Sequence, residues 1–185
     1  MKKTLFLSPP TFDGYDGGAG SRYQCKREVK SFWYPTWLAQ LSARVPDSKL
    51  IDAPAQDLSL DDLLPMANDY EFLVLYTSTP SFENDVKVAE ALKEKNPGLL
   101  IGFCGAHVAV NNETAIQASP VIDFVCDSEF DFTIQEIAEG KPVEEVIGVT
   151  ILKDGKPHFT GKRPIIRSEE HTSELQSLAY LVCRL

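Results

Sequence analysis

Short runs of apolar residues alternate along this chain with segments in which apolar positions recur at helical spacing. Two of the runs, FLVLY and LLIGF, are apolar almost throughout, as expected for parallel strands that are buried on both faces. Strands and helices that alternate in this way indicate an α/β fold with a five-stranded parallel sheet and helices on both faces. The predicted strands are Thr4–Leu7, Lys49–Asp52, Phe72–Tyr76, Leu99–Cys104 and Ile122–Cys126.

Five segments between and after these runs have the spacing of amphipathic helices. The clearest is Phe82–Lys95, which has acidic residues in its first turn and lysines in its last, and which stops at an Asn-Pro-Gly sequence. Another carries a stripe of large apolar residues that includes Trp33 and Trp37, and we expect both rings in the core. The predicted helices are Ser31–Val45, Leu60–Ala67, Phe82–Lys95, Asn112–Ala118 and Phe130–Ala138.

The pattern changes after Gly140. GVTILKDGKPHF predicts two short strands joined by a two-residue Asp-Gly turn, and we interpret residues 147–166 as a hairpin that links this domain to a following one. Residues 167–185 contain RSEEHTSELQS, which resembles the translation of a common sequencing-library adapter, so we expect this tail to be non-native. The alternative is a genuine short amphipathic helix. The ligand-binding domain is then predicted to span residues 1–146.

The loops that follow the predicted strands have an unusual composition. In parallel α/β sheets, ligands bind beyond the carboxyl ends of the strands. The loops there are SPPTFDGYDGGAG, TSTPSF, GAHVAV and DSEFDF, and they consist largely of small or hydroxylated residues. None contains a convincing pair of a catalytic acid and a catalytic base. This composition favours the binding of a large planar ligand through backbone and hydroxyl contacts, rather than catalysis.

Four glycines lie close together in the first of these loops, but they fit neither known phosphate-binding pattern. A dinucleotide site requires G-x-G-x-x-G before a helix, and a Walker loop requires G-x-x-x-x-G-K-[ST]. Here no lysine follows, and two prolines stand where the turn should tighten. The loop is therefore either part of a lid over a larger ligand or a flexible surface loop.

Charge and cysteine content exclude several classes of protein. The net charge is −9, which argues against nucleic acid as a partner because nucleic acids are bound through lysine and arginine. No apolar run is long enough for a transmembrane segment, and Leu5–Leu7 is too short for a secretory signal, so we expect a cytoplasmic protein. Cys25, Cys104, Cys126 and Cys183 are widely spaced, which indicates neither a metal site nor a disulfide framework. We expect the first three to be thiols that are buried or have no functional role.

Four segments together resemble the N-terminal cobalamin-binding domain of radical SAM enzymes. They are FLSPP, TSTPSFENDVKVAEALKEKNPG, IGFCGAH and DFVCDSEFDFTIQEIAEG, in this order and spacing. The combination DGYDGGAGSRYQ…SFWYPTWLAQ is similar to the hopanoid-biosynthesis-associated group of that superfamily. The resemblance covers about residues 1–166. It implies a flavodoxin-like (Rossmann-like) fold, cobalamin as cofactor, and a parent enzyme that acts on a hopanoid side chain, in making its cyclitol ether.

The same resemblance implies that the chemistry belongs to another part of the parent protein. The family binds a [4Fe-4S] cluster through C-x-x-x-C-x-x-C in a following barrel domain, where the cluster cleaves S-adenosylmethionine. This chain has no such cysteine triplet. We therefore expect no catalytic residues here, no site for the cluster or for S-adenosylmethionine, and a missing C-terminal radical SAM domain as the partner. The chain should bind cobalamin without turning over.

Cobalamin domains of another type carry D-x-H-x-x-G, whose histidine binds the cobalt. Here His107 has Gly105 two positions before it, and His158 has Lys156 in place of the aspartate. The resemblance therefore implies no histidine ligand of this type. It does imply cofactor contacts from the strand-end loops. The residues that we assign to these contacts are Pro9, Gly17, Gly18, Thr77, Ser78, Thr79, Gly105, Ala106, His107, Glu129, Phe130 and Thr133.

Each of these assignments has a simpler alternative. The hydroxyl residues after the third strand could cap the helix that follows. Acidic residues near Glu129 could be favoured by a helix N-terminus, and the family's Gly-Glu-x-Glu pattern is altered here to Ser128 and Asp131. His107 could be a packed or solvated side chain.

Other functions fit the α/β pattern less well. The nucleotide-sugar-binding half of a glycosyltransferase that acts on a lipid acceptor would need charged groups aimed at a diphosphate, and the loops lack them. A phosphoacceptor receiver domain would need an acidic cluster after the first strand, where this chain has SPP. A structural or interaction module is also compatible with the pattern.

Overall fold

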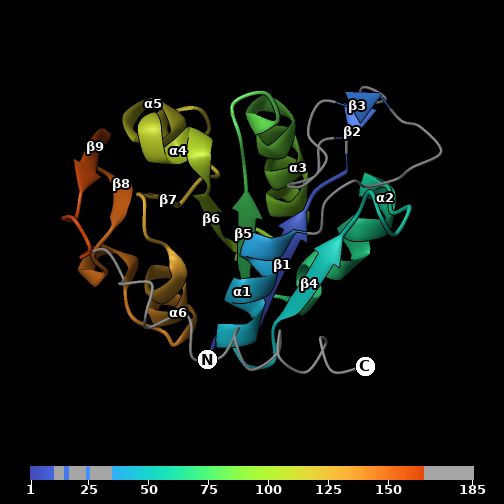
Figure 1. Ribbon diagram of the computed structural model, residues 1–185, viewed down its shortest axis with the longest axis horizontal. Helices are drawn as coiled ribbons and strands as arrows, with labels where there is room; N and C mark the ends of the chain where they lie inside the picture. Colours follow the sequence, from blue (N-terminus) through green and yellow to red (C-terminus); the bar gives the residue numbers. More distant parts are fainter. Residues whose placement is uncertain (11–14, 17–23, 26–34, 165–185) are drawn as a thin grey trace, which may run out of the picture.

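The computed structural model describes residues 1–10, 15–16, 24–25 and 35–164. Its main sheet has the strand order β4-β1-β5-β6-β7-β8-β9, in which neighbours from β4 to β7 are parallel and the last two strands are antiparallel (Figure 1). This confirms the predicted α/β fold. The strands are β1 Thr4–Ser8, β4 Lys49–Asp52, β5 Phe72–Tyr76, β6 Leu100–Cys104, β7 Phe124–Cys126, β8 Val149–Lys153 and β9 Lys156–Phe159, with β2 Tyr15–Asp16 and β3 Gln24–Cys25 in a separate two-stranded sheet.

Helices cover both faces of the main sheet. The core on one face includes residues of α1 and α6, and the core on the other includes residues of α2 to α5. The helix α3 has the predicted bounds, and α4 lies in GAHVAV, which the sequence indicated as a loop. The helices are α1 Thr36–Arg44, α2 Leu60–Leu63, α3 Phe82–Lys95, α4 Ala106–Val110, α5 Asn112–Gln117 and α6 Asp131–Ala138, with 3-10 turns η1 Leu64–Asp69 and η2 Val143–Glu145.

The predicted helix at Leu60–Ala67 is divided into two kinds of helix. Ser59 and Asp62 form a reciprocal capping box, which starts α2. A proline lies in the first turn of η1, where a missing N–H costs no hydrogen bond, and the chain continues from there as a 3-10 helix. The amphipathic pattern alone does not distinguish these two forms.

The C-terminal hairpin extends the sheet. Val125 of β7 pairs with Thr150 of β8 in antiparallel register, and β8 in turn pairs with β9. The side chains of Val149 and Thr150 are buried as a result. The sequence indicated a hairpin but not this pairing, which places β8 and β9 at one edge of the main sheet.

Both core layers are tightly packed around the central strands. Gly102 of β6 is required there, because a Cβ atom at this position would collide with the ring of Phe124. Because residue 102 is a glycine, the Phe124 ring can pack against the ring of Phe72 on β5, with 5.9 Å between the ring centroids. Cys104 and Cys126 are buried, as expected, and burial raises the pKa of the Cys126 thiol. In the part of the chain that the structure describes, no helix has the length and hydropathy needed to cross a membrane.

Candidate functional site

A pocket of about 570 Å³ opens on the α1 and α6 side of the sheet, at the carboxyl ends of its central strands. The helix α6 follows β7 of the main sheet, and its first turn lines the pocket, while α1 follows β3 and contributes Trp37 and Gln40 of its first two turns. From α1 and the ends of β5 and β6 the lining residues are Trp37, Gln40, Tyr76, Gly105, Ala106 and Ala109. From the loop after β7 and the start of α6 they are Ser128, Glu129, Phe130 and Asp131.

Aromatic rings and small residues dominate the inner surface of this pocket. Tyr76 and Phe130 meet edge to face, with ring centroids 6.1 Å apart and planes at 70°. Gly105 and Ala106 add almost no side-chain bulk, so a ligand can approach the backbone at this point. The described lining contains no lysine, arginine, histidine or cysteine, and its charged groups are the carboxylates of Glu129 and Asp131. Such a lining suits an aromatic or otherwise apolar guest.

Gly105 fixes the relative position of two strand-end loops. Its φ is 111°, which other residues rarely adopt, and a Cβ atom here would collide with the carbonyl oxygen of Thr77. The Thr77 amide also donates to the carbonyl of Cys104 at 2.8 Å. The end of β5 is therefore held directly against the end of β6, and the glycine makes this contact possible.

Thr77, Ser78 and Thr79 follow β5. Thr77 and Ser78 make hydrogen bonds within the loop that these residues form. The side chains of Thr77 and Ser78 are buried. The Ser78 amide donates to Ser81 Oγ at 3.2 Å, and its carbonyl accepts from the Phe82 amide at 3.0 Å. These contacts of the Ser78 backbone set the first turn of α3, and no side-chain hydroxyl caps this helix. Thr79 is exposed.

His107 lies at the start of α4, against the first turn of α3. Its ring is 4.3 Å from the ring of Phe82 between centroids, and its Nδ1 is 3.2 Å from Thr79 Oγ1. Burial lowers the pKa of His107 below its ordinary value, so the imidazole is neutral at pH 7. His107 is not among the residues that line the pocket.

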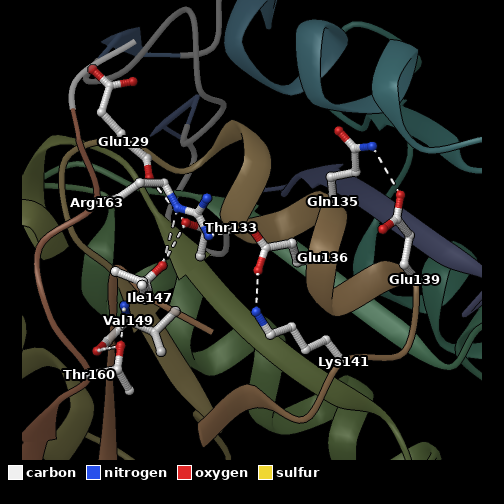
Figure 2. Close-up of polar contacts among 10 residues, drawn as sticks. All are labelled: Glu129, Thr133, Gln135, Glu136, Glu139, Lys141, Ile147, Val149, Thr160 and Arg163. Atoms are coloured by element: carbon white, nitrogen blue, oxygen red, sulfur yellow. Dashed lines mark hydrogen bonds and ion pairs between the residues drawn. The ribbon is translucent and has the colours of Figure 1, made fainter. Parts of the chain in front are cut away.

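The loop between β7 and α6 is tied to the start of the hairpin (Figure 2). The Thr133 hydroxyl lies 3.2 Å from the carbonyl oxygen of Glu129 and 3.1 Å from that of Ile147, and it donates to these acceptors. The Asp127 amide donates to the Gly148 carbonyl at 2.9 Å. Thr133 itself is fully buried. Thr133 therefore holds the backbone of Glu129, a residue that lines the pocket.

An ion-pair cluster holds the segment after β9 against α6 (Figure 2). Arg163 Nε donates to the Ile147 carbonyl at 3.3 Å, and its Nη2 is 2.6 Å from Glu136 Oε1. Lys141 Nζ is 2.8 Å from the other carboxylate oxygen of Glu136. Burial alone would raise the pKa of Glu136, but the hydrogen bonds and charges of Lys141 and Arg163 outweigh it and leave the pKa below its ordinary value.

The predicted site residues fall into distinct groups. Gly105, Ala106, Glu129 and Phe130 line the pocket together. Thr77, Ser78, Thr79 and His107 lie at the same strand ends but toward α3, and Thr133 lies beneath the loop. Pro9 is buried just after β1, and Gly17 and Gly18 lie outside the described residues.

Sequence reasoning misplaced one residue of the pocket. We expected Trp37 in the core, but its side chain is 53% exposed. Consecutive residues of a helix point about 100° apart, and on α1 the sheet is faced by Leu38 rather than by Trp37. Leu38, Leu41 and Val45 form the buried stripe, and Trp37 lies beside it, toward the pocket. Trp33, the other expected core tryptophan, lies outside the described residues.

Gln40, Tyr76 and Ala109 also line the pocket without having been predicted. Tyr76 is the last residue of an apolar strand, and this position at the strand end could have indicated that it lies at the pocket. Gln40 and Ala109 are on helices and carry no signal in the sequence.

Comparisons with known proteins found a relative in sequence and a likeness in fold. No family profile matches the chain. An uncharacterized methyltransferase from Pyrococcus horikoshii is 27% identical to it over 177 residues, which cover 91% of this chain and 36% of that protein. The two are distant homologues. The chain spans about a third of the length of this relative.

A solved structure has the same fold. The radical S-adenosylmethionine methyltransferase TsrM from Kitasatospora setae, solved with cobalamin and a [4Fe-4S] cluster bound, matches with a TM-score of 0.63 and 10% sequence identity. The match covers 90% of this chain and 30% of TsrM. At this identity the likeness establishes the shared fold.

Proposed function

We propose that this chain is the cobalamin-binding module of a protein related to radical SAM methyltransferases. The observation that carries the proposal is the aromatic pocket between α1 and α6, at the carboxyl ends of β5 and β6. In open α/β sheets this edge is where ligands bind. The resemblance of the strand-end loops, the distant homology to a methyltransferase and the fold shared with TsrM support the same assignment.

The residues present fit the cofactor in size and chemistry. Cobalamin has a broad corrin ring and a nucleotide tail that ends in a planar aromatic base. A pocket of about 570 Å³ is within the usual range for small-molecule sites, and it is suited to the tail, with the corrin lying across the strand ends outside it. The rings of Tyr76 and Phe130 would contact the base. Gly105 and Ala106 would allow the tail to pass close to the backbone.

The predicted residues on the α3 side would then lie next to the corrin. Thr79 is exposed there and His107 is partly exposed. When bound, cobalamin supplies a cobalt centre that can carry a methyl group. The chain lacks D-x-H-x-x-G, so we propose that no histidine of that motif would bind the cobalt.

The activity of the whole protein is a further part of the proposal. The matched proteins are about three times as long as the aligned region, so we assign the [4Fe-4S] cluster and S-adenosylmethionine to a C-terminal radical SAM domain that this module serves. The substrate assignment, a hopanoid side chain in cyclitol ether formation, rests on the sequence resemblance. Deletion of the gene should remove the cyclitol ether from the lipid extract, and an unchanged hopanoid profile would contradict it.

An absorbance titration with aquacobalamin tests the binding proposal. We expect one equivalent of coloured cofactor to remain with the chain through gel filtration, with the spectrum of a corrinoid whose own base is not on the cobalt. UDP-glucose, the probe for the glycosyltransferase alternative, should not compete. A colourless protein after saturation with aquacobalamin would contradict the proposal.

A further inference from the structure

Trp37 is exposed in a way that core packing does not explain. It lies on α1, where Leu38 and Leu41 are fully buried, yet more than half of its own surface is accessible. A tryptophan ring is the largest apolar surface that a side chain can bury. When it stays exposed at a pocket, the favourable free energy of burying that surface is not gained. Its position among the lining residues gives it a potential contact with a molecule that occupies the pocket.

The helices α1 and α6 also contact one another outside the pocket lining. Positions 37, 40 and 44 follow one another along one side of α1 at helical spacing. The Arg44 guanidinium lies 4.6 Å from the centre of the Phe132 ring, which joins the two helices. Nearer the start of α1, Trp37 and Gln40 line the pocket together with Phe130.

The charged residues that line the pocket determine which part of a nucleotide tail can bind there. Glu129 and Asp131 are the charged residues of the described lining, and they would repel a phosphodiester. An uncharged heteroaromatic base has no such cost, and it gains stacking area on exposed rings.

We propose that Trp37 stacks on the base of the cobalamin nucleotide tail and thereby makes the chain select complete cobalamin over corrinoids that lack the base. This inference rests on the proposed function, and it adds a residue that sets corrinoid specificity. The loop resemblance did not assign Trp37 to the cofactor. Stacking of a base on one aromatic side chain changes affinity by roughly 10- to 100-fold.

Parallel titrations with aquacobalamin and with cobinamide, which lacks the nucleotide tail, test this proposal on the 185-residue chain. Trp37→Ala should weaken aquacobalamin binding roughly 10- to 100-fold and leave cobinamide binding unchanged. Trp37→Phe keeps an aromatic face and should retain most of the preference. Val110→Ala is the control, because Val110 is another exposed apolar residue, 80% accessible, and does not line the pocket.

The outcomes separate this inference from the function on which it rests. If the unaltered chain binds neither corrinoid, the cobalamin proposal fails. If it binds both, but Trp37→Ala affects the two equally or affects neither, cobalamin binding stands and the role of Trp37 is overturned. Circular dichroism of Trp37→Ala establishes that the variant is folded, and Trp37→Phe provides the second test if it is not.

Discussion

The two faces of the sheet are covered to different extents. On one face, α3 buries a continuous row of side chains that includes Val88, Ala89 and Leu92. On the other, α1 buries Leu38 and Leu41 but leaves Trp37 exposed, and a pocket remains between it and α6. The α3 face shows how closely this sheet can be covered. The space on the opposite face is therefore a feature of α1 and α6, and it lies where this fold binds ligands.

Gly105 holds the end of β6 against the end of β5, and its replacement should have a large effect on stability. Gly105→Ala places a methyl group against the Thr77 backbone, which has no freedom to move away, in a conformation with φ of 111°. We expect a loss of about 4 kcal/mol in the free energy of unfolding, measured in urea. Gly140 has a similar φ of 103° but nothing near its Cβ position, so Gly140→Ala should cost about 1–2 kcal/mol. Equal losses would show that Gly105 is not sterically required.

Two substitutions within α1 test the contrast between its buried and exposed sides. Leu41 is fully buried, so Leu41→Ala should cost about 2–5 kcal/mol of unfolding free energy. Trp37→Ala removes a larger side chain but one that is half exposed, and it should cost about 1 kcal/mol or less. Thermal or urea denaturation measures both. A larger loss for Trp37→Ala than for Leu41→Ala would place Trp37 in the core after all.

The ion-pair cluster on α6 should give a smaller, pH-dependent effect. The pKa of Glu136 is below its ordinary value, so its contribution to stability is complete above the pKa of the unfolded chain and is lost as the pH falls through the lower, folded pKa. Arg163→Ala should reduce stability at neutral pH by about 1 kcal/mol or less, and should reduce the loss of stability between about pH 6 and about pH 3.

Glu139→Gln is the matched control for this pH dependence. Glu139 follows α6, its carboxylate accepts a hydrogen bond from the Gln135 amide, and it takes part in none of the ion pairs found in the described part of the chain. This variant should keep the acid-side loss of stability that Arg163→Ala reduces. An Arg163→Ala profile parallel to that of the unaltered chain would show that the cluster does not hold the segment after β9.

Local signals were sufficient to predict most of the architecture. The central strands are nearly continuous apolar runs, and α3 has charges at both ends and an Asn-Pro-Gly stop, so both could be located from neighbouring residues. Helix α4 was missed because it is short and built mainly of small residues. The pairing of β8 with β7 was missed because it joins segments that are distant in sequence, and no local pattern specifies that register.

The site could be predicted only in part for a related reason. Strand ends are visible in the sequence, so Gly105, Ala106, Glu129 and Phe130 were placed at the edge of the sheet where the pocket lies. Which side of the edge each residue faces depends on tertiary packing, and the sequence did not separate His107 from this group. The role of Trp37 depended on the rotation of α1, which is set by the fit of Leu38 and Leu41 against the sheet.

The most direct test of the account fills the pocket and measures cobalamin binding. Ala106 lines the pocket and is exposed, so Ala106→Trp should occupy the space without disturbing the core. Ala118, at the end of α5, is exposed but does not line it, and Ala118→Trp is the control. We predict that Ala106→Trp weakens aquacobalamin binding roughly tenfold or more while Ala118→Trp leaves it unchanged. Aquacobalamin binding by Ala106→Trp that equals that of the unaltered chain would contradict the account.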